Sequence, residues 1–204
     1  ATLTLGGEPQ VIANGAGPGA LTEPQGTISA STTGGLAFLT ERAGRAGQLT
    51  WFDRSGRAQS AIKQPDEGEY LNPAMSPDGG RVAVNVMDRQ TGNWDVWIVD
   101  AARGVPARLT SDDAIDSDAV WSPDGKEVVF SSTRGDHLGL YRQAVDGAGS
   151  AEPIYVPKGA QVLTAIDWTR DGKFILFAES SLSSIWMLPL ASDRKPTSLL
   201  SGWN

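Results

Sequence analysis

The strongest candidate for metal chemistry in this sequence is an acidic run near its middle. Four aspartates fall within seven residues, at Asp112, Asp113, Asp116 and Asp118. Closely spaced carboxylate oxygens are ligands that Ca²⁺ prefers. The EF-hand pattern does not fit, because its glycine at position six and its glutamate at position twelve are missing. Charged loops of this kind are usually only solvated, so the run is a weak calcium candidate and no firm metal site is predicted.

Nucleophilic catalysis has little support in this chain. His137 is its only histidine, which rules out a multi-histidine metal site and leaves one candidate base for a Ser-His-Asp triad. The chain has no G-x-S-x-G elbow, and it lacks the Gly-rich loop, H-R-D and D-F-G segments of a protein kinase. It has no cysteine, so disulfides and thiolate metal ligands are excluded. We therefore predict no catalytic residue and no cofactor, and we expect His137 to be an exposed loop residue.

The composition narrows the classes of partner. Hydrophobic residues make up 40% of the chain and charged residues 20%, which is ordinary for a globular domain. The formal net charge is −7 and the basic residues are scattered, which argues against a nucleic-acid surface. No apolar run approaches the length of about 18 residues that a membrane-spanning helix needs, so we expect no membrane insertion. Because the sequence begins Ala-Thr-Leu-Thr-Leu without Met, we expect it to be a piece of a longer protein.

The segments that would position any site form a sequence repeat. Ser76-Pro77-Asp78-Gly79 returns as Ser122-Pro123-Asp124-Gly125 and, weakened, as Thr169-Arg170-Asp171-Gly172, with an eroded copy at Ser31-Thr32-Thr33-Gly34. The aspartates lie 46 and 47 residues apart (78 to 124, 124 to 171). Proline presets φ for a type I turn and glycine supplies a positive φ, so the motif joins two strands. We interpret its aspartates as turn residues and not as catalytic ones.

Large apolar residues recur along the sequence at nearly the same spacing as the turns. Trp51, Trp97, Tyr141 and Trp186 follow one another at 46, 44 and 45 residues, and Met75, Trp121 and Trp168 at 46 and 47. We expect the first of these columns to form the core between repeats. Each copy also carries short runs that are typical of strands. In the second, third and fourth copies these runs are Arg81–Val86, Trp94–Asp100, Arg108–Thr110, Glu127–Thr133, Leu138–Val145, Glu152–Val156, Phe174–Glu179, Ser184–Leu190 and Pro196–Leu200.

A short opening strand, such as Asp118–Trp121, brings each copy to four strands. Four antiparallel strands in about 45 residues match the size of a propeller blade. The sequence therefore predicts a single all-β domain, a β-propeller sector of four four-stranded antiparallel blades at about 26–70, 71–116, 117–162 and 163–200. The prediction also includes flanking strands from incomplete neighbouring blades, with residues 1–25 as part of a preceding blade.

The second and third copies resemble the TolB-like, WD-like β-propeller repeat family. The matching segments run from Met75-Ser-Pro-Asp-Gly to Asp100 with Arg108-Leu-Thr, and from Trp121-Ser-Pro-Asp-Gly to Val145. More narrowly, Gln48–Gly56 and Leu188–Pro196 are similar to segments of the C-terminal propellers of bacterial membrane-anchored serine/threonine kinases. That resemblance implies a propeller outside the cytoplasm, on the periplasmic or cell-surface side, in a parent that is a kinase. The family usually has six or more blades, so four copies suggest an open arc whose exposed edges would favour a homodimer.

Binding residues are expected at the rim of the channel, where the first strand of each blade begins. By alignment, Thr27, Asn72, Asp118 and Ala165 should face the axis there, with Glu69, Tyr70 and Asp116 on the preceding loops. Loops on one face of a rigid fold commonly carry binding residues. We therefore predict a non-enzymatic platform that binds a protein or a small molecule, as an extracytoplasmic sensor or interaction domain. The alternatives are the propeller part of a prolyl-oligopeptidase-like hydrolase or of a lyase, and a Tol-Pal-type periplasmic scaffold.

Overall fold

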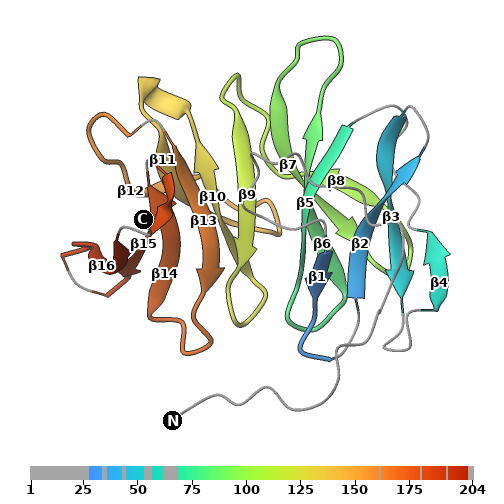
Figure 1. Ribbon diagram of the computed structural model, residues 1–204. Helices are drawn as coiled ribbons and strands as arrows, with labels where there is room; N and C mark the ends of the chain where they lie inside the picture. Colours follow the sequence, from blue (N-terminus) through green and yellow to red (C-terminus); the bar gives the residue numbers. More distant parts are fainter. Residues whose placement is uncertain are drawn as a thin grey trace.

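The computed structural model describes residues 28–33, 36–42, 45–52, 57–61, 69–160, 162–179, 181–191 and 193–201. The first two sheets contain β1 (Ile28–Ala30), β2 (Leu36–Arg42), β3 (Arg45–Phe52), β4 (Ala58–Ala61), β5 (Glu69–Met75), β6 (Arg81–Met87), β7 (Trp94–Asp100) and β8 (Pro106–Arg108). The last two contain β9 (Asp116–Trp121), β10 (Glu127–Ser132), β11 (Gly139–Ala144), β12 (Glu152–Tyr155), β13 (Leu163–Trp168), β14 (Phe174–Glu179), β15 (Ser181–Pro189) and β16 (Thr197–Ser201). A short 3₁₀ helix, η1 (Arg134–Asp136), lies between β10 and β11 (Figure 1).

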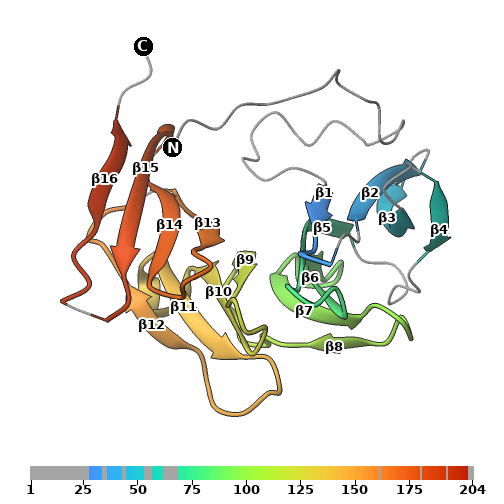
Figure 2. The same cartoon turned by 90° about the horizontal axis from the view of Figure 1, so that it is seen from below.

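The four sheets are the blades of a propeller. Each consists of four consecutive strands in chain order, paired antiparallel from first to fourth. Figure 2 shows the sheets following one another along an arc, with β1, β5, β9 and β13 on the inside and β4, β8, β12 and β16 on the outside. The prediction of four four-stranded antiparallel blades is confirmed. Residues 1–25, predicted to belong to a preceding blade, lie outside the part of the chain that the structure describes.

The closing strand of the second blade differs from its prediction. Arg108–Thr110 was expected to be extended, whereas β8 ends at Arg108. The backbone amides of Leu109 and Thr110 both donate to the carbonyl of Val96, and a ladder cannot continue from two amides that share one acceptor. The Thr110 hydroxyl instead accepts from the Val96 amide at 3.0 Å and donates to the buried Asp95 carboxylate at 3.2 Å. The chain is thereby turned toward the next blade.

The repeated tetrapeptide closes the hairpin between the first and second strands of a blade. In the second blade the Ser76 hydroxyl donates to Asp78 Oδ1 at 2.6 Å, and the same oxygen accepts from the Gly80 amide at 2.9 Å. Gly79 has φ of 74°, a value that costs other residues strain. The matching hydroxyl–carboxylate distances are 2.7 Å from Ser122 to Asp124 and 2.7 Å from Thr169 to Asp171. These aspartates organise their own turns.

The turn carboxylates should make the protein sensitive to acid. Hydrogen bonds from the Ser76, Ser122 and Thr169 hydroxyls, followed by backbone amides, lower the pKa of Asp78, Asp124 and Asp171. A carboxyl whose folded pKa lies below its unfolded value stabilises the fold above about pH 4, and the contribution is lost as the pH falls through the folded pKa. The combined variant Asp78→Asn, Asp124→Asn, Asp171→Asn should therefore be less stable than the parent at pH 7, and the difference should shrink as the pH falls below about 4. Urea midpoints measured across this range check it, and a stability difference independent of pH would contradict it.

The core consists of three clusters between successive blades. Val82, Val84 and Trp97 of the second blade pack toward the first, Phe130 and Tyr141 of the third pack toward the second, and the fourth blade repeats the arrangement against the third. Val84 pairs with Trp97, Phe130 with Tyr141, and Phe177 with Trp186, so each pair lies on one face of its sheet. The predicted packing of these aromatic side chains between blades is confirmed.

Trp51 reaches the core from the other face of its sheet. It pairs with Ala37, whereas the residue opposite Phe38 is Thr50. Thr50 therefore holds the place that Trp97 and Tyr141 have in the next two blades, and the prediction that Trp51 shares their column is wrong by one residue. Successive side chains of a strand point to opposite faces, so Trp51 packs forward onto the second blade, where its Nε1 donates to the Ala101 carbonyl at 3.2 Å.

Candidate functional site

The predicted rim brings Asn72 and Asp118 into direct contact. Both residues have positive φ, 50° and 56°, a conformation that Asn and Asp adopt more readily than other residues with a Cβ. Each lies where the pairing of the first strand with the second shifts in register. Asn72 Nδ2 donates to Asp118 Oδ1 at 2.8 Å, and the Ser117 hydroxyl donates to Asp118 Oδ2 at 2.9 Å. The pair ties the second blade to the third beside the axis.

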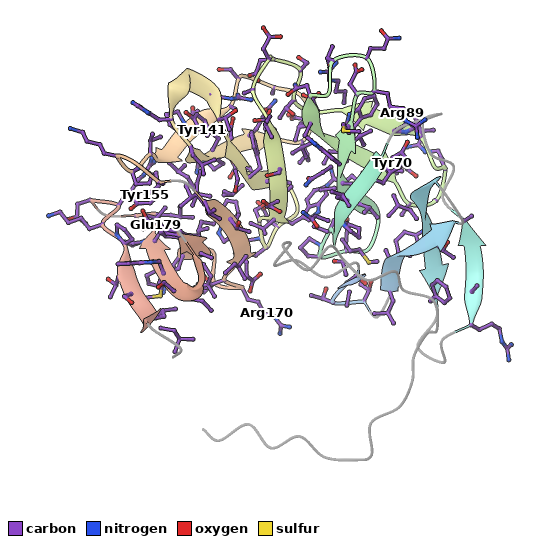
Figure 3. All side chains as sticks on the ribbon, turned by 45° about the horizontal axis from the view of Figure 1, so that its top comes forward. Tyr70, Arg89, Tyr141, Tyr155, Arg170 and Glu179 are labelled. Atoms are coloured by element: carbon purple, nitrogen blue, oxygen red, sulfur yellow. The ribbon has the colours of Figure 1, made fainter. Side chains whose placement is uncertain are left out.

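Asn72 and Asp118 are themselves buried, with 6% and 7% of their surface exposed, and the other rim side chains that the structure describes are buried as well. Tyr70 is 4% exposed and packs in the cluster between the first and second blades, and Figure 3 shows it among the side chains inside the arc. Asp116 is fully buried. Glu69 is described only as the first residue of β5, opposite Met87, and Thr27 lies outside the described residues. Ala165 is buried, and its amide donates to the Ser131 hydroxyl of the preceding blade at 3.4 Å.

A guanidinium holds the acidic run together. Arg134 Nη2 lies 2.8 Å from Asp116 Oδ2 and 2.8 Å from Asp112 Oδ2. The same guanidinium stacks over the rings of Phe130 and Tyr141, with its carbon 5.6 Å and 5.3 Å from their centroids. This arrangement combines a paired buried charge with cation–π contacts.

Burial raises the pKa of Asp116, against opposing effects of the Ser132 and Thr110 hydroxyls and of Arg134. Even so, Asp116 Oδ1 makes no hydrogen bond, and Arg134 contacts the other carboxylate oxygen, Oδ2.

The calcium candidates are not arranged as a ligand set. Asp112 and Asp116 share Arg134, Asp118 is bonded to Asn72 and Ser117, and Asp113 is exposed. Within the described ranges, no group of three or more His, Cys, Asp or Glu side chains could hold a metal ion. His137 follows η1 and is exposed, at the end of the arc opposite the repeated hairpins (Figure 1).

A cavity of about 660 Å³ lies at the opposite end of the inner strands, beside the repeated turns. All four blades contribute to it. Its wall is built from the inner strands and from the prolines of the repeated turns, and it presents polar and apolar surface in nearly equal parts. The lining residues are Ser29, Ala30, Thr32, Pro73, Ala74, Met75, Pro77, Ala119, Val120, Trp121, Pro123, Ile166, Asp167, Trp168 and Arg170.

Hydrogen bonds between blades fix the wall of this axial cavity. The Met75 amide donates to the Ser29 hydroxyl at 2.8 Å, and Trp121 Nε1 donates to the Ala74 carbonyl at 2.8 Å. Arg81 adds a guanidinium 5.0 Å from the centre of the Trp121 ring. A wall held by bonds that cross from blade to blade is largely preformed, as most ligand sites are.

The exposed groups of the axial cavity come from the two ends of the arc, with Ala30 and Thr32 on the first blade and the others on the fourth. Ile166 is 37% exposed, and Asp167 and Arg170 beside it are also exposed. Figure 3 shows Arg170 projecting away from the ribbon on the turn side of the arc. An apolar surface with one acidic and one basic group at its edge can bury an apolar side chain and orient a charged or polar group next to it.

The sequence pattern predicted binding residues at the rim and did not indicate the axial cavity. Its lining residues were already visible as repeat columns, because Pro77 and Pro123 belong to the tetrapeptide and Met75, Trp121 and Trp168 precede it. Their equal spacing on inner strands is the signal that could have indicated a shared surface at the axis. No helix among the described residues is long and apolar enough to cross a membrane.

Comparison with known proteins agrees with this architecture. The family model described as "TolB beta propeller domain" matches residues 54–203. A protein of Bacillus subtilis named "Uncharacterized peptidase YuxL" is 30% identical over 115 residues, covering 53% of this chain and 17% of its own. The "Tol-Pal system protein TolB" of Francisella tularensis is 26% identical over 108 residues, covering 52% of this chain and 24% of its own.

Among solved structures, TolB from Acinetobacter baumannii superposes with a TM-score of 0.70 at 23% identity, over 87% of this chain and 44% of that one. At this identity the likeness shows the fold alone. The chain thus spans less than half of each of these proteins.

Proposed function

Because the chain belongs to the TolB beta propeller domain family, we propose that it is a non-catalytic platform that binds a protein segment or a small ligand in the axial cavity. The observation that carries this proposal is the cavity itself, a volume of about 660 Å³ with both polar and apolar wall surface, to which every blade contributes. An extended segment with one apolar side chain, placed between Trp168 and the turn prolines, matches its shape and chemistry. Asp167 and Arg170 would then fix the orientation of the segment.

An enzymatic role has less support from the geometry. The cavity contains no histidine, and His137 lies on the other side of the arc. The match to the Bacillus protein named as a peptidase covers 17% of its length. A propeller that assists a hydrolase or a lyase would use the same cavity to admit or position substrate, so the binding role is common to these alternatives.

Peptide display on phage tests the binding role. We expect selection from a random 12-residue library on the folded chain to yield peptides that lose about tenfold or more in affinity for the variants Ile166→Asp and Arg170→Glu, since such a loss is typical of a central contact. Val105→Asp is the matched control, because Val105 is 57% exposed on the turn between β7 and β8 and does not line the cavity. Peptides sensitive to Asp118→Asn instead would place binding at the rim. Peptides indifferent to all these variants would refute a binding site on the axis.

The location outside the cytoplasm, the sensor role and the kinase parent are part of this proposal. They are supported by the resemblance of Gln48–Gly56 and Leu188–Pro196 to propeller segments of membrane-anchored kinases. The reading frame that encodes the chain tests them directly. A kinase domain and a membrane span upstream would support the sensor, whereas a hydrolase domain downstream would favour a peptidase.

A further inference from the structure

One position of the repeated turn lies in the wall of the axial cavity in all four blades. It is the second residue of the tetrapeptide, which in chain order is Thr32, Pro77, Pro123 and Arg170. Three of these residues carry no charge, whereas Arg170 carries a guanidinium. Because every blade places this position at the axis, its place in the wall is a property of the repeat and does not depend on which blade follows.

The hairpin itself does not need an arginine at this position. Proline presets the turn in the second and third blades, and in the first blade the Thr32 hydroxyl donates to the Pro77 carbonyl of the next turn. Arg170 offers neither a ring nor a hydroxyl. A guanidinium has five N–H donors in a fixed planar fork, so a single contact of the kind that Thr32 makes would leave most of them available.

The other charged side chains of the repeated turns already have partners. The turn aspartates accept hydrogen bonds from hydroxyls of their own turns, and the two turn lysines lie within 3.9 Å of those carboxylates. Arg81, which follows the second turn, donates to the Gly125 carbonyl at 2.6 Å. Arg170 makes no hydrogen bond and no ion pair with the part of the chain that the structure describes, which leaves its guanidinium available to a ligand.

The surroundings of Arg170 favour a single negative charge next to an apolar group. Ile166 is 37% exposed on the same blade and lines the cavity with Trp168. Asp167 is exposed at the same edge, where its Oδ1 accepts from the Trp168 amide at 2.9 Å, and this carboxylate would repel a doubly charged phosphate. The fork of one arginine matches one carboxylate with two parallel hydrogen bonds, whereas phosphorylated motifs are bound by clusters of arginines.

We infer that Arg170 anchors a carboxylate, and that the segment bound in the axial cavity carries an aspartate or a glutamate beside the apolar side chain that packs on Ile166. The inference rests on the proposed function, because it requires that the cavity binds an extended segment. It adds the class of that segment, which is acidic and apolar at neighbouring positions.

Peptides selected from the random 12-residue library test the anchor. We expect them to carry an acidic residue directly beside an apolar one. In synthetic, C-terminally amidated copies, replacing that acidic residue by its amide should lower the affinity for the parent about tenfold and leave the affinity for Arg170→Gln unchanged. Lys173→Gln is the matched control, because the Lys173 side chain is 69% exposed on the same turn and does not line the cavity. It should bind both peptides as the parent does.

A charge exchange distinguishes this inference from the proposed function. Arg170→Glu should bind the selected peptides weakly, and a lysine in place of their acidic residue should restore the binding. Peptides that lose affinity for Ile166→Asp but not for Arg170→Gln would leave the cavity as the binding site and overturn the carboxylate anchor. A copy with phosphoserine at the acidic position that binds more tightly than the glutamate copy would overturn it as well.

Discussion

Replacing Arg134 with alanine is expected to lower the free energy of unfolding by about 3–5 kcal/mol, the cost of breaking a buried ion pair by removing one partner. The Asp116 carboxylate would be left fully buried without its counter-charge. Phe130 and Tyr141 would lose the guanidinium that stacks on them. Total stabilities of domains are about 5–15 kcal/mol, so the variant should unfold at a much lower urea concentration or fail to accumulate.

Two controls separate the buried charge from the general loss of a side chain. The double variant Arg134→Ala, Asp116→Asn should recover part of the loss, because the unpaired charge is gone. Arg103→Ala removes an ion pair of similar length, 2.8 Å to Asp100, but the Arg103 side chain is 78% exposed, so little measurable change in stability is expected. Urea unfolding followed by tryptophan fluorescence gives all three values. If Arg134→Ala behaves like Arg103→Ala, the proposed role of the buried pair is wrong.

The repeat was predictable because turn chemistry and strand pattern agree within each copy. Trp94–Asp100 and Phe174–Glu179 were predicted with the bounds that the structure has. Both strands are short runs rich in apolar and aromatic residues, and Phe174–Glu179 directly follows a hairpin closed by a positive-φ glycine. A hairpin closed by fixed residues also sets the register of the strands that it joins. Equal spacing of such hairpins was enough to count the blades.

The position of Trp51 was not predictable from spacing. The connection between the second and third strands differs in length from blade to blade, since residues 43–44 separate β2 from β3 whereas residues 88–93 separate β6 from β7. Counting back from Trp97 by a period of 46 therefore lands one residue away from the true equivalent, Thr50. A shift of one residue moves a side chain to the other face of its sheet. Only the paired register resolves such a case.

The sequence indicated neighbouring polar residues only where they occupy the same position of successive repeats. Asn72 and Asp118 were found because they occupy one position of successive inner strands. The pairing of Arg134 with Asp116 and Asp112 was missed, since it joins the start of one strand, the loop before it and a 3₁₀ helix. Along the sequence Arg134 lies well beyond Asp112 and Asp116, and nothing in the sequence indicates that Asp116 is buried. Whether a charged side chain is buried depends on the neighbouring blade, so burial cannot be predicted from the sequence pattern of one blade.

Phe177→Ala is expected to cost about 3–5 kcal/mol, which is typical when a fully buried phenylalanine is replaced and a cavity remains. Phe177 is completely buried between the third and fourth blades, where its ring meets that of Tyr155. Leu200→Ala is the matched control, because Leu200 is the equivalent of Tyr155 but is 44% exposed. The Leu200→Ala change should alter the free energy of unfolding by less than about 0.5 kcal/mol.

Hydrogen exchange shows where the effect of Phe177→Ala is located. The blades contact only their neighbours, so the loss of one interface should open the fourth blade more often than the second. Amides of β13–β15 should therefore exchange faster in the variant, while those of β5–β7 keep their protection. Equal acceleration in all four blades would mean that the arc unfolds as one unit. In that event the interface between the third and fourth blades would not be a separable element.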